Sequence, residues 1–206
     1  MENERADQKS VDRISNLPQS VICEILSWLP TRESVATCIL SRSWRNCWKD
    51  LQILNFSTRS FTGTNDLTRF VAFVNWFLLQ QHRASVRKLR IYYSTKYGFD
   101  DAALKSWVSS AIGSHLEELK LDLLTEELTL TQVRFPSLKT LKMSYCHPNL
   151  VMKILPGSPV LESLDLELMR GKISVFKIHS PSLKRLYLFD STYYQITDLL
   201  EIIPPP

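Results

Sequence analysis

The chain has few of the residues and patterns that mark enzyme sites. It contains only five glycines in 206 residues, and they form no glycine-rich loop of the kind that holds phosphate groups. Its four histidines are scattered, and none stands at metal-ligand spacing with a second histidine, cysteine or acid. We therefore predict that the chain has no enzymatic activity of its own, no metal site and no cofactor.

Cysteine is also scarce. The four cysteines are Cys23, Cys38, Cys47 and Cys146. They show no C-x-x-C spacing, and three of them fall at apolar positions of expected helices. This pattern predicts reduced, buried thiols in a cytosolic or nuclear protein.

Long apolar runs and blocks of like charge are absent. The longest apolar stretch, Phe70 to Leu79, is interrupted by Asn75 and is too short to span a bilayer. The N-terminus, MENERADQKSVDR, is polar and unlike a signal or transit peptide. The 25 basic and 21 acidic residues are spread along the chain and give a net charge of +4. We expect an intracellular protein, in the nucleus or the cytoplasm, with no membrane and no nucleic-acid partner.

What the chain does contain is an internal repeat. Five segments read apolar-x-x-apolar-x-apolar at intervals of 22 to 30 residues, and a weaker copy, LQILNFST, precedes them at Leu51. The five are VRKLRIYYS from Val86, LEELKLDLL from Leu116, LKTLKMSYC from Leu138, LESLDLELM from Leu161 and LKRLYLFDS from Leu183. The pattern is typical of the strand of a leucine-rich repeat. Because no unit can bury its own apolar face, the units are expected to stack.

Alternation within each segment predicts which residues share a core. The fourth and sixth positions point inward, and the residues between them point outward. The inward pairs are Leu89 and Ile91, Leu119 and Leu121, Leu141 and Met143, Leu164 and Leu166, and Leu186 and Leu188. Two helices are expected beside the strands, one from Asn65 to Gln81 and one from a cap at Asp100 or Asp101 to Gly113. These features predict an α/β solenoid with a parallel sheet.

The segment before the repeats predicts three short helices between residues 18 and 49. The first, within LPQSVICEILSWLP, is apolar around roughly 220° of its circumference, whereas a surface helix needs an apolar stripe of about 100°. Thr31 can cap the second helix, and Ser41 or Ser43 can cap a third that contains Trp44. About half of the apolar surface of the first helix therefore has no obvious cover within the chain, and part of it should be exposed.

This N-terminal segment resembles the F-box. The resemblance rests on DRIS before Leu17-Pro18, on ILS from Ile25, on LPT from Leu29, and on LSR from Leu40 followed by Trp44-Arg45. With the repeats behind it, the chain is similar to the F-box/leucine-rich-repeat family of flowering plants. In that family the F-box docks on the Skp adaptor of a cullin-RING ubiquitin ligase, and the repeats hold the protein to be ubiquitinated. Members often continue into a further C-terminal domain, whereas this sequence stops at LLEIIPPP.

The fold expected on this basis is α+β overall. Residues 1–11 would be a disordered tail, residues 12–50 a three-helix F-box, and residues 51–206 the leucine-rich-repeat array. Its units begin near 51, 86, 116, 138, 161 and 183.

The resemblance implies an adaptor-binding set and a target-binding set. The adaptor-binding set is Leu17, Pro18, Ile22, Ile25, Leu26, Leu29, Leu40 and Trp44. Four of these have a second interpretation as core residues, namely Ile22, Ile25, Leu26 and Leu40.

The outward strand positions form the concave face of such an array. The target-binding set taken from this face is Lys88, Arg90, Tyr92, Lys120, Lys142, Asp165, Arg185, Tyr187 and Phe189. Charges of both signs favour a protein target over nucleic acid. The implied function is the substrate-recognition subunit of an SCF ubiquitin ligase.

Two alternatives remain open from the sequence. Arg42, Arg45 and Lys49 at i, i+3 and i+7 could lie on the third helix of a helix-turn-helix-like module that binds nucleic acid. The chain could also bind an adaptor yet lack a functional target face, because little sequence follows the last strand to cover the end of the array.

Overall fold

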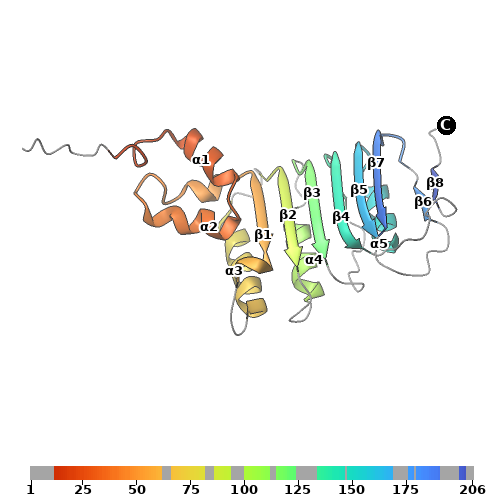
Figure 1. Cartoon of the computed structure of the whole chain (residues 1–206), viewed down its shortest axis with the longest axis horizontal. Helices are drawn as coiled ribbons and strands as arrows, with labels where there is room; N and C mark the ends of the chain where they lie inside the picture. The colour runs from red at the N-terminus through yellow and green to blue at the C-terminus, as the bar shows by residue number, and fades with distance from the viewer. Residues whose placement is uncertain are drawn as a thin grey trace, which may run out of the picture.

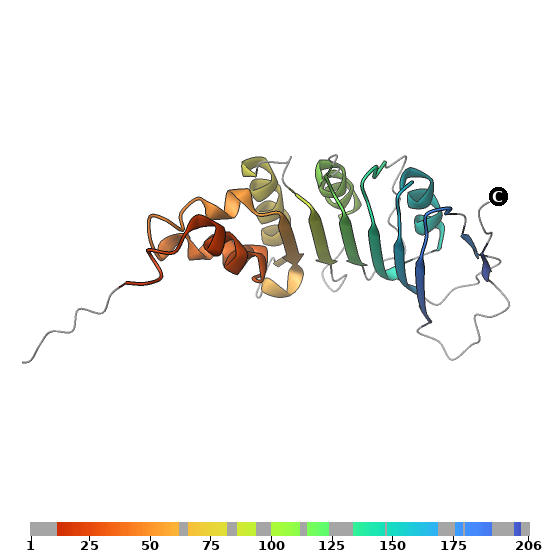
Figure 2. The same cartoon turned by 90° about the horizontal axis from the view of Figure 1, so that it is seen from above.

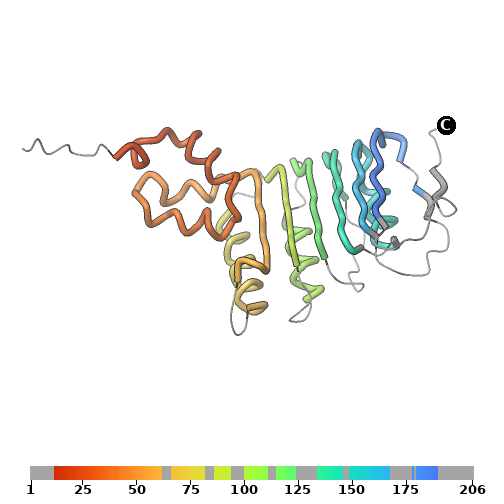
Figure 3. The backbone as a smooth tube through the Cα atoms, viewed as in Figure 1, coloured from red at the N-terminus to blue at the C-terminus, as the bar shows by residue number. Residues whose placement is uncertain are grey.

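The computed structural model is a row of parallel strands with helical segments at its N-terminal end (Figure 1). It describes residues 12–61, 66–81, 86–93, 100–111, 115–123, 134–146, 148–168, 176–178, 180–190 and 200–202. The predicted tail, residues 1–11, lies outside the described residues. The backbone trace advances steadily from one end of the row to the other, as expected for an array in which each unit contacts its neighbours (Figure 3).

The N-terminal segment, residues 12–50, contains two α-helices and two short 3-10 helices. Helix α1 spans Gln19–Ser27, α2 spans Thr31–Ala36, η1 spans Thr37–Ile39 and η2 spans Cys47–Asp50. A proline precedes each α-helix, Pro18 with φ −58° and Pro30 with φ −53°. Proline fixes φ near these values, so each Leu-Pro pair sets where the next helix begins.

The predicted third helix, capped by Ser41 or Ser43 and containing Trp44, is corrected to the shorter 3-10 helix η2, which begins at Cys47. Between η1 and η2 the chain forms turns, and Ser43 caps no helix there. Its hydroxyl donates to the carbonyl of Ser15 at 2.8 Å, and the Trp44 indole N–H donates to the carbonyl of Ile14 at 3.1 Å. These side chains hold the start of the described chain against the turn. The helix that a helix-turn-helix module requires is therefore not formed in this described segment.

Thr31 is likewise not a helix cap. It lies inside α2 and is buried, and its hydroxyl oxygen accepts a hydrogen bond from the backbone N–H of Asn55 at 2.8 Å. The threonine thus joins α2 to the first strand of the sheet.

Six strands form one parallel sheet in the order β1-β2-β3-β4-β5-β7. Their bounds are β1 Ile53–Ser57, β2 Lys88–Tyr93, β3 Glu118–Leu123, β4 Thr140–Cys146, β5 Ser163–Leu168 and β7 Arg185–Asp190. The weaker copy at Leu51 supplies β1. One ladder pairs Leu54, Leu89, Leu119, Leu141, Leu164 and Leu186 in register. The predicted inward pairs and their alignment are confirmed.

The residue before each strand of this six-stranded sheet, from β2 onward, is charged. Arg87, Glu117, Lys139, Glu162 and Lys184 alternate in charge from unit to unit. The Arg87 guanidinium lies 2.9 Å from the Glu117 carboxylate, and the Lys184 ammonium lies 3.2 Å from that of Glu162. Surface ion pairs of this kind contribute little stability. Backbone hydrogen bonds also join the units at this position: the Glu117 carbonyl accepts two N–H groups of the next unit at 2.9 and 3.0 Å.

The described helices beside the sheet all lie on one of its faces (Figure 2). They are α3 Asp66–Gln80, α4 Asp101–Ala111, and α5 Pro148–Ile154 with η6 Leu155–Gly157. Asp100 caps α4 as predicted, since its carboxylate accepts the backbone N–H of Ala103 at 2.9 Å. The predicted end of this helix, Ile112 and Gly113, lies outside the described residues.

The helices and the inward strand residues form one core. Leu89, Leu119, Leu141 and Leu164 are fully buried, and so are the helix residues that pack on the strands. The helix residues are Phe70, Val74 and Phe77 from α3, Leu104, Trp107 and Val108 from α4, and Val151 and Ile154 from α5. The short strands β6 Phe176–Ile178 and β8 Leu200–Ile202 pair in a separate two-stranded sheet.

The N-terminal segment packs directly on the first unit of the array. The Trp48 ring lies 5.3 Å from that of Trp76 and 5.2 Å from that of Phe77, centroid to centroid. The short helix η3, Thr58–Ser60, follows β1, and the Arg32 guanidinium donates to its Ser60 carbonyl. A small helical unit that cannot support its own core is therefore completed by the repeats.

Candidate interaction surfaces

Large apolar side chains are exposed on the N-terminal segment. On α1, Ile25 is 39% exposed and Trp28 is 80% exposed, whereas Ile22 and Leu26 on its other side are buried. Val21 on α1 and Ile14 before it are also exposed, as are Ile39 and Leu40 at the end of η1, by 86% and 56%. The wide apolar arc of the first helix is therefore divided as expected, with one side in the core and the other in solvent. We call Val21, Ile25, Trp28, Ile39 and Leu40 the apolar surface.

The structure divides the predicted adaptor-binding set. Pro18, Ile25 and Leu40 are exposed, and Leu17 and Leu29 are half-buried against the core. Ile22, Leu26 and Trp44 are buried within the chain, so their inclusion in that set is corrected. Helical periodicity marks burial without saying what provides it, and here α2, the 43–50 segment and the array provide it.

The three cysteines of this segment form no disulfide and are partly or fully buried. Among the described residues, Cys23, Cys38 and Cys47 are free, and Cys47 is buried. Burial raises the pKa of the Cys23 and Cys47 thiols, and the Cys47 thiol donates to the Ser43 carbonyl at 2.9 Å. The reduced state stays a prediction, and of these three cysteines Cys47 is the one that is fully buried as predicted. The Cys146 side chain lies outside the described part of the chain.

The uncovered side of the six-stranded sheet, which we call the open face, carries the predicted target-binding set. Its charged residues near β2 and β3 are largely paired. The Arg90 guanidinium donates twice to Glu118, at 2.9 and 3.0 Å, and the Lys88 ammonium lies 3.2 Å from Glu118. Burial opposes the charge of Glu118, but these hydrogen bonds and charges hold its pKa below the usual value. Glu118 therefore remains ionised and fixes both cations.

Further along the open face the pairing continues on β4 and β5. The Lys142 ammonium lies 2.5 Å from the Asp165 carboxylate. On β7, by contrast, Arg185, Tyr187 and Phe189 are all exposed. The predicted set thus contains paired residues near its centre and an exposed aromatic group at its C-terminal end.

A pocket of about 220 Å³ opens on this face between β1 and β3. It is lined by Asn55, Arg90, Ile91, Tyr92, Lys120 and Asp122. The Arg59 guanidinium lies 3.9 Å from the Tyr92 ring centroid and donates to the Tyr92 hydroxyl at 2.6 Å. Among the described residues, no ion-pair partner stands within reach of Lys120, and Asp122 Oδ1 is a buried oxygen without a hydrogen-bond partner. Burial raises the pKa of Asp122.

A bulge in β4 turns Tyr145 toward the acids of this face. The strand register shifts between Ser144 and Cys146, and Tyr145 has φ 56°, which is strained for a residue other than glycine. The charge of Glu167 and a hydrogen bond to it raise the pKa of Tyr145, and the charge of Asp122 raises it further. The bulge therefore adds an aromatic hydroxyl beside the acidic residues of the open face.

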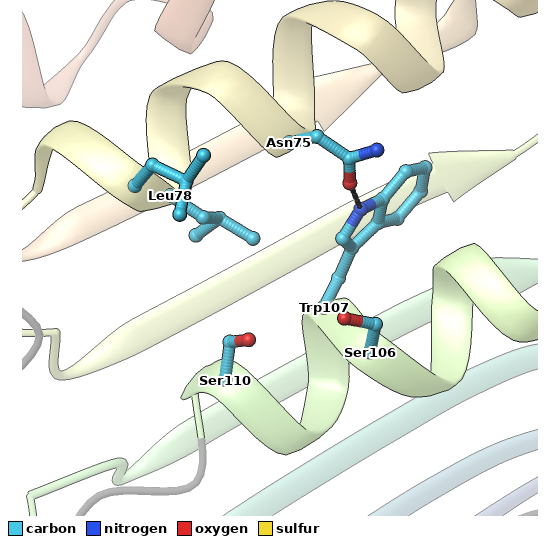
Figure 4. Close-up of a pocket in the computed structure, with 6 residues that line it drawn as sticks. Asn75, Leu78, Ser106, Trp107 and Ser110 are labelled. Carbon is cyan, nitrogen blue, oxygen red and sulfur yellow. Dashed lines mark hydrogen bonds between the residues drawn. The ribbon is translucent and has the colours of Figure 1, made fainter.

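A second cavity, of about 280 Å³, lies on the helical face between α3 and α4 (Figure 4). It is lined by Asn75, Leu78, Leu79, Ser106, Trp107 and Ser110. The Asn75 side-chain oxygen accepts the Trp107 indole N–H at 2.7 Å, which satisfies the polar atom of a buried ring. This bond explains why Asn75 interrupts the apolar stretch of α3 and gives the cavity a structural role.

Comparison with known families decides what the chain is. The sequence model of the F-box domain matches residues 14–56, which include α1, α2, η1, η2 and most of β1. A second model, described as FBD-associated F-box protein At5g56370, LRR repeats, matches residues 73–200 and thus more than half of the chain.

The chain belongs to the plant F-box/leucine-rich-repeat family. Its relatives in Arabidopsis thaliana include the F-box/FBD/LRR-repeat protein At1g51370, 33% identical over 85% of this chain and 45% of that protein. The F-box/FBD/LRR-repeat protein At3g52680 is 32% identical over 87% of this chain and 46% of that protein. F-box protein At4g09920 is 27% identical over 95% of this chain and 71% of that protein. The chain thus spans less than half the length of the first two relatives.

Sequence reasoning missed Asn55, Arg59 and Tyr145 on the open face of this F-box/leucine-rich-repeat protein, and it placed Asp122 outward without including it in the target-binding set. Alternation in the weaker copy at β1 could have identified Asn55 as an outward residue. Alternation does place Asp122 outward, but no pattern distinguishes it from an ordinary surface acid. Arg59 follows β1 in η3, and Tyr145 would point inward without the bulge, so nothing in the local sequence indicates either.

Within the part of the repeats and the F-box that the structure describes, no three histidine, cysteine or acidic side chains lie close enough together to hold a metal ion. The helices described here are all too short or too polar to cross a membrane.

Proposed function

We propose that this chain is the substrate-recognition subunit of an SCF (Skp-cullin-F-box) ubiquitin ligase. In this proposal the F-box docks on a Skp-type adaptor and through it on a cullin-RING ligase. The open face of the repeats binds a target protein for ubiquitination. The chain carries out no chemistry itself, and it acts inside the cell, in the nucleus or the cytoplasm.

The apolar surface of the F-box is the observation that carries this proposal. Leaving large apolar side chains such as Trp28 and Ile39 in water is unfavourable, and an F-box segment that exposes several of them on α1 and at η1 offers apolar area to a partner. A partner that covered them would gain about 25 cal/mol for each Å² of apolar area removed from water. The adaptor-binding set we propose is Leu17, Pro18, Ile25, Leu29 and Leu40 from the sequence, with Val21, Trp28 and Ile39 from the structure.

The packing between the two parts supports the target-binding half of the proposal. The F-box shares a continuous core with the first repeat through Trp48, Trp76 and Phe77. A target bound on the open face would therefore be held in a defined position relative to an adaptor on the apolar surface. Tyr187 and Phe189, exposed on β7, are residue types that anchor protein interfaces.

The test is binding of the full chain to a purified plant Skp-type adaptor. Leu40→Asp replaces a side chain that is 56% exposed, so the fold should survive. Covering that fraction of a leucine is worth about 1–1.5 kcal/mol, and a buried carboxylate costs more, so we expect the Kd to rise at least about tenfold.

Leu79→Asp is the matched control, because Leu79 is 74% exposed on α3 and lies outside the F-box match. It should leave the adaptor affinity unchanged. The proposal fails if the wild-type chain does not bind the adaptor, or if both variants bind it equally well while circular dichroism shows both folded.

A further inference from the structure

The pocket between β1 and β3 has fixed walls and open polar groups. Arg90 is held by its two hydrogen bonds to Glu118, and Tyr92 is held between its own strand and the Arg59 guanidinium. Side chains that are already fixed lose little entropy when a ligand binds, so these walls are preorganised. The pocket is therefore a formed feature of the open face.

Lys120 and Asp122 are the open groups. They lie two residues apart on β3 and point to the same side of the strand. The charge of Lys120 acts on Asp122, but no ion pair or hydrogen bond joins them, so three N–H donors remain on the half-exposed Lys120 and one buried acceptor oxygen on Asp122. Asn55 adds an amide that both donates and accepts, and among the described residues no side-chain hydrogen bond engages it.

A neutral group that carries both a donor and an acceptor can satisfy this arrangement. A carboxylate would accept from Lys120 but would repel the carboxylate of Asp122. An ammonium or guanidinium would donate to Asp122 but would repel Lys120 and Arg90. A neutral carboxamide carries an acceptor oxygen and a donor NH₂ on one carbon, so it can accept from Lys120 and donate to Asp122 together.

We propose that this pocket binds the side-chain carboxamide of an asparagine or glutamine in the target protein. The amide oxygen accepts from the Lys120 ammonium, the amide NH₂ donates to Asp122, and Asn55 pairs with the same group from β1. The inference rests on the proposed target-binding role of the open face and specifies the chemistry of one contact. A pocket that hydrogen-bonds both ends of an amide rejects groups lacking either function, because a buried partner would be left unpaired.

The test uses a phage-displayed library of random 12-residue peptides, selected against the full chain. The wild-type protein should enrich asparagine or glutamine at one fixed position of the recovered peptides. Lys120→Ala and Asp122→Ala should lose that enrichment. Lys142→Ala is the matched control: Lys142 lies beside Lys120 in register but is paired with Asp165, so this variant should keep it.

Synthetic peptides then give the contribution of the carboxamide to the binding affinity. A recovered peptide with its glutamine changed to glutamate, alanine or lysine should bind about tenfold more weakly in fluorescence anisotropy. Enrichment of acidic or basic residues in place of the amide overturns the proposal. So does an unchanged preference in the Lys120→Ala variant, or the absence of a preferred residue at any position. Adaptor binding is measured separately, so a failure of the proposed ligase role is distinguished from a failure of this contact.

Discussion

The ladder of inward leucines allows one substitution to be compared at two neighbouring positions. Leu164 on β5 is 0% exposed, and its register partner Leu186 on β7 is partly exposed, because β7 is the last strand of the sheet. Leu164→Ala removes a fully packed side chain and leaves a cavity, which costs about 3 kcal/mol. Leu186→Ala removes a side chain that is only partly buried, so we expect a loss of about 1 kcal/mol.

The assay is thermal unfolding followed by far-ultraviolet circular dichroism. For a chain of this size about 1 kcal/mol corresponds to about 2–4 °C, so the Tm should fall by about 6–12 °C for Leu164→Ala and about 2–4 °C for Leu186→Ala. Both variants make the same residue change in the same ladder. The difference between their Tm values therefore reports how completely the end of the array is covered.

Equal losses of stability would refute this reasoning. They would mean that Leu186 is packed in solution as completely as Leu164, so that the end of the ladder is fully covered. The position of β7 at the edge of the sheet would then say nothing about stability.

Two further predictions concern single side chains of the array. Asp100→Ala removes the cap that accepts the Ala103 N–H, so the free energy of unfolding should fall by about 1 kcal/mol in urea titrations, whereas Asp100→Asn should lose much less. Because the pKa of Glu118 is lowered in the folded chain, its contribution to stability is full above its ordinary value of 4.5 and is lost as the pH falls through the folded value. Glu118→Gln should therefore destabilise the chain at neutral pH and converge with the wild type in acid, and a pH-independent difference would contradict this assignment.

The repeat fold could be predicted because its pattern has a direct physical cause. A period of two within a strand places alternate residues on opposite faces, and a repeat of 22 to 30 residues brings each strand beside the previous one. Leu89, Leu119 and Leu141 therefore had to align wherever the connecting segments ran. The cap at Asp100 was equally readable because capping depends on neighbours within one turn.

The helices of the F-box were less predictable because tertiary contacts decide them. Trp44 and Cys47 are spaced like residues of an amphipathic helix, yet the Trp44 indole donates to Ile14, thirty residues earlier in the chain. Thr31 is a good capping residue that the structure uses to hold β1. Local propensity is a weak preference, and a distant hydrogen bond or a packed ring outweighs it.

The sequence by itself determined that the first helix carries more apolar surface than one core can cover. It could not say which part stays exposed, because periodicity reports burial and not its source. Only the tertiary structure decided that Ile22 and Leu26 face the core while Ile25 and Trp28 face solvent. The tertiary structure also decided that Arg90 and Lys142 are paired with acids, whereas Lys120 and Asp122 keep open hydrogen-bonding groups. The reason is that strand register determines which residues of neighbouring strands lie beside each other.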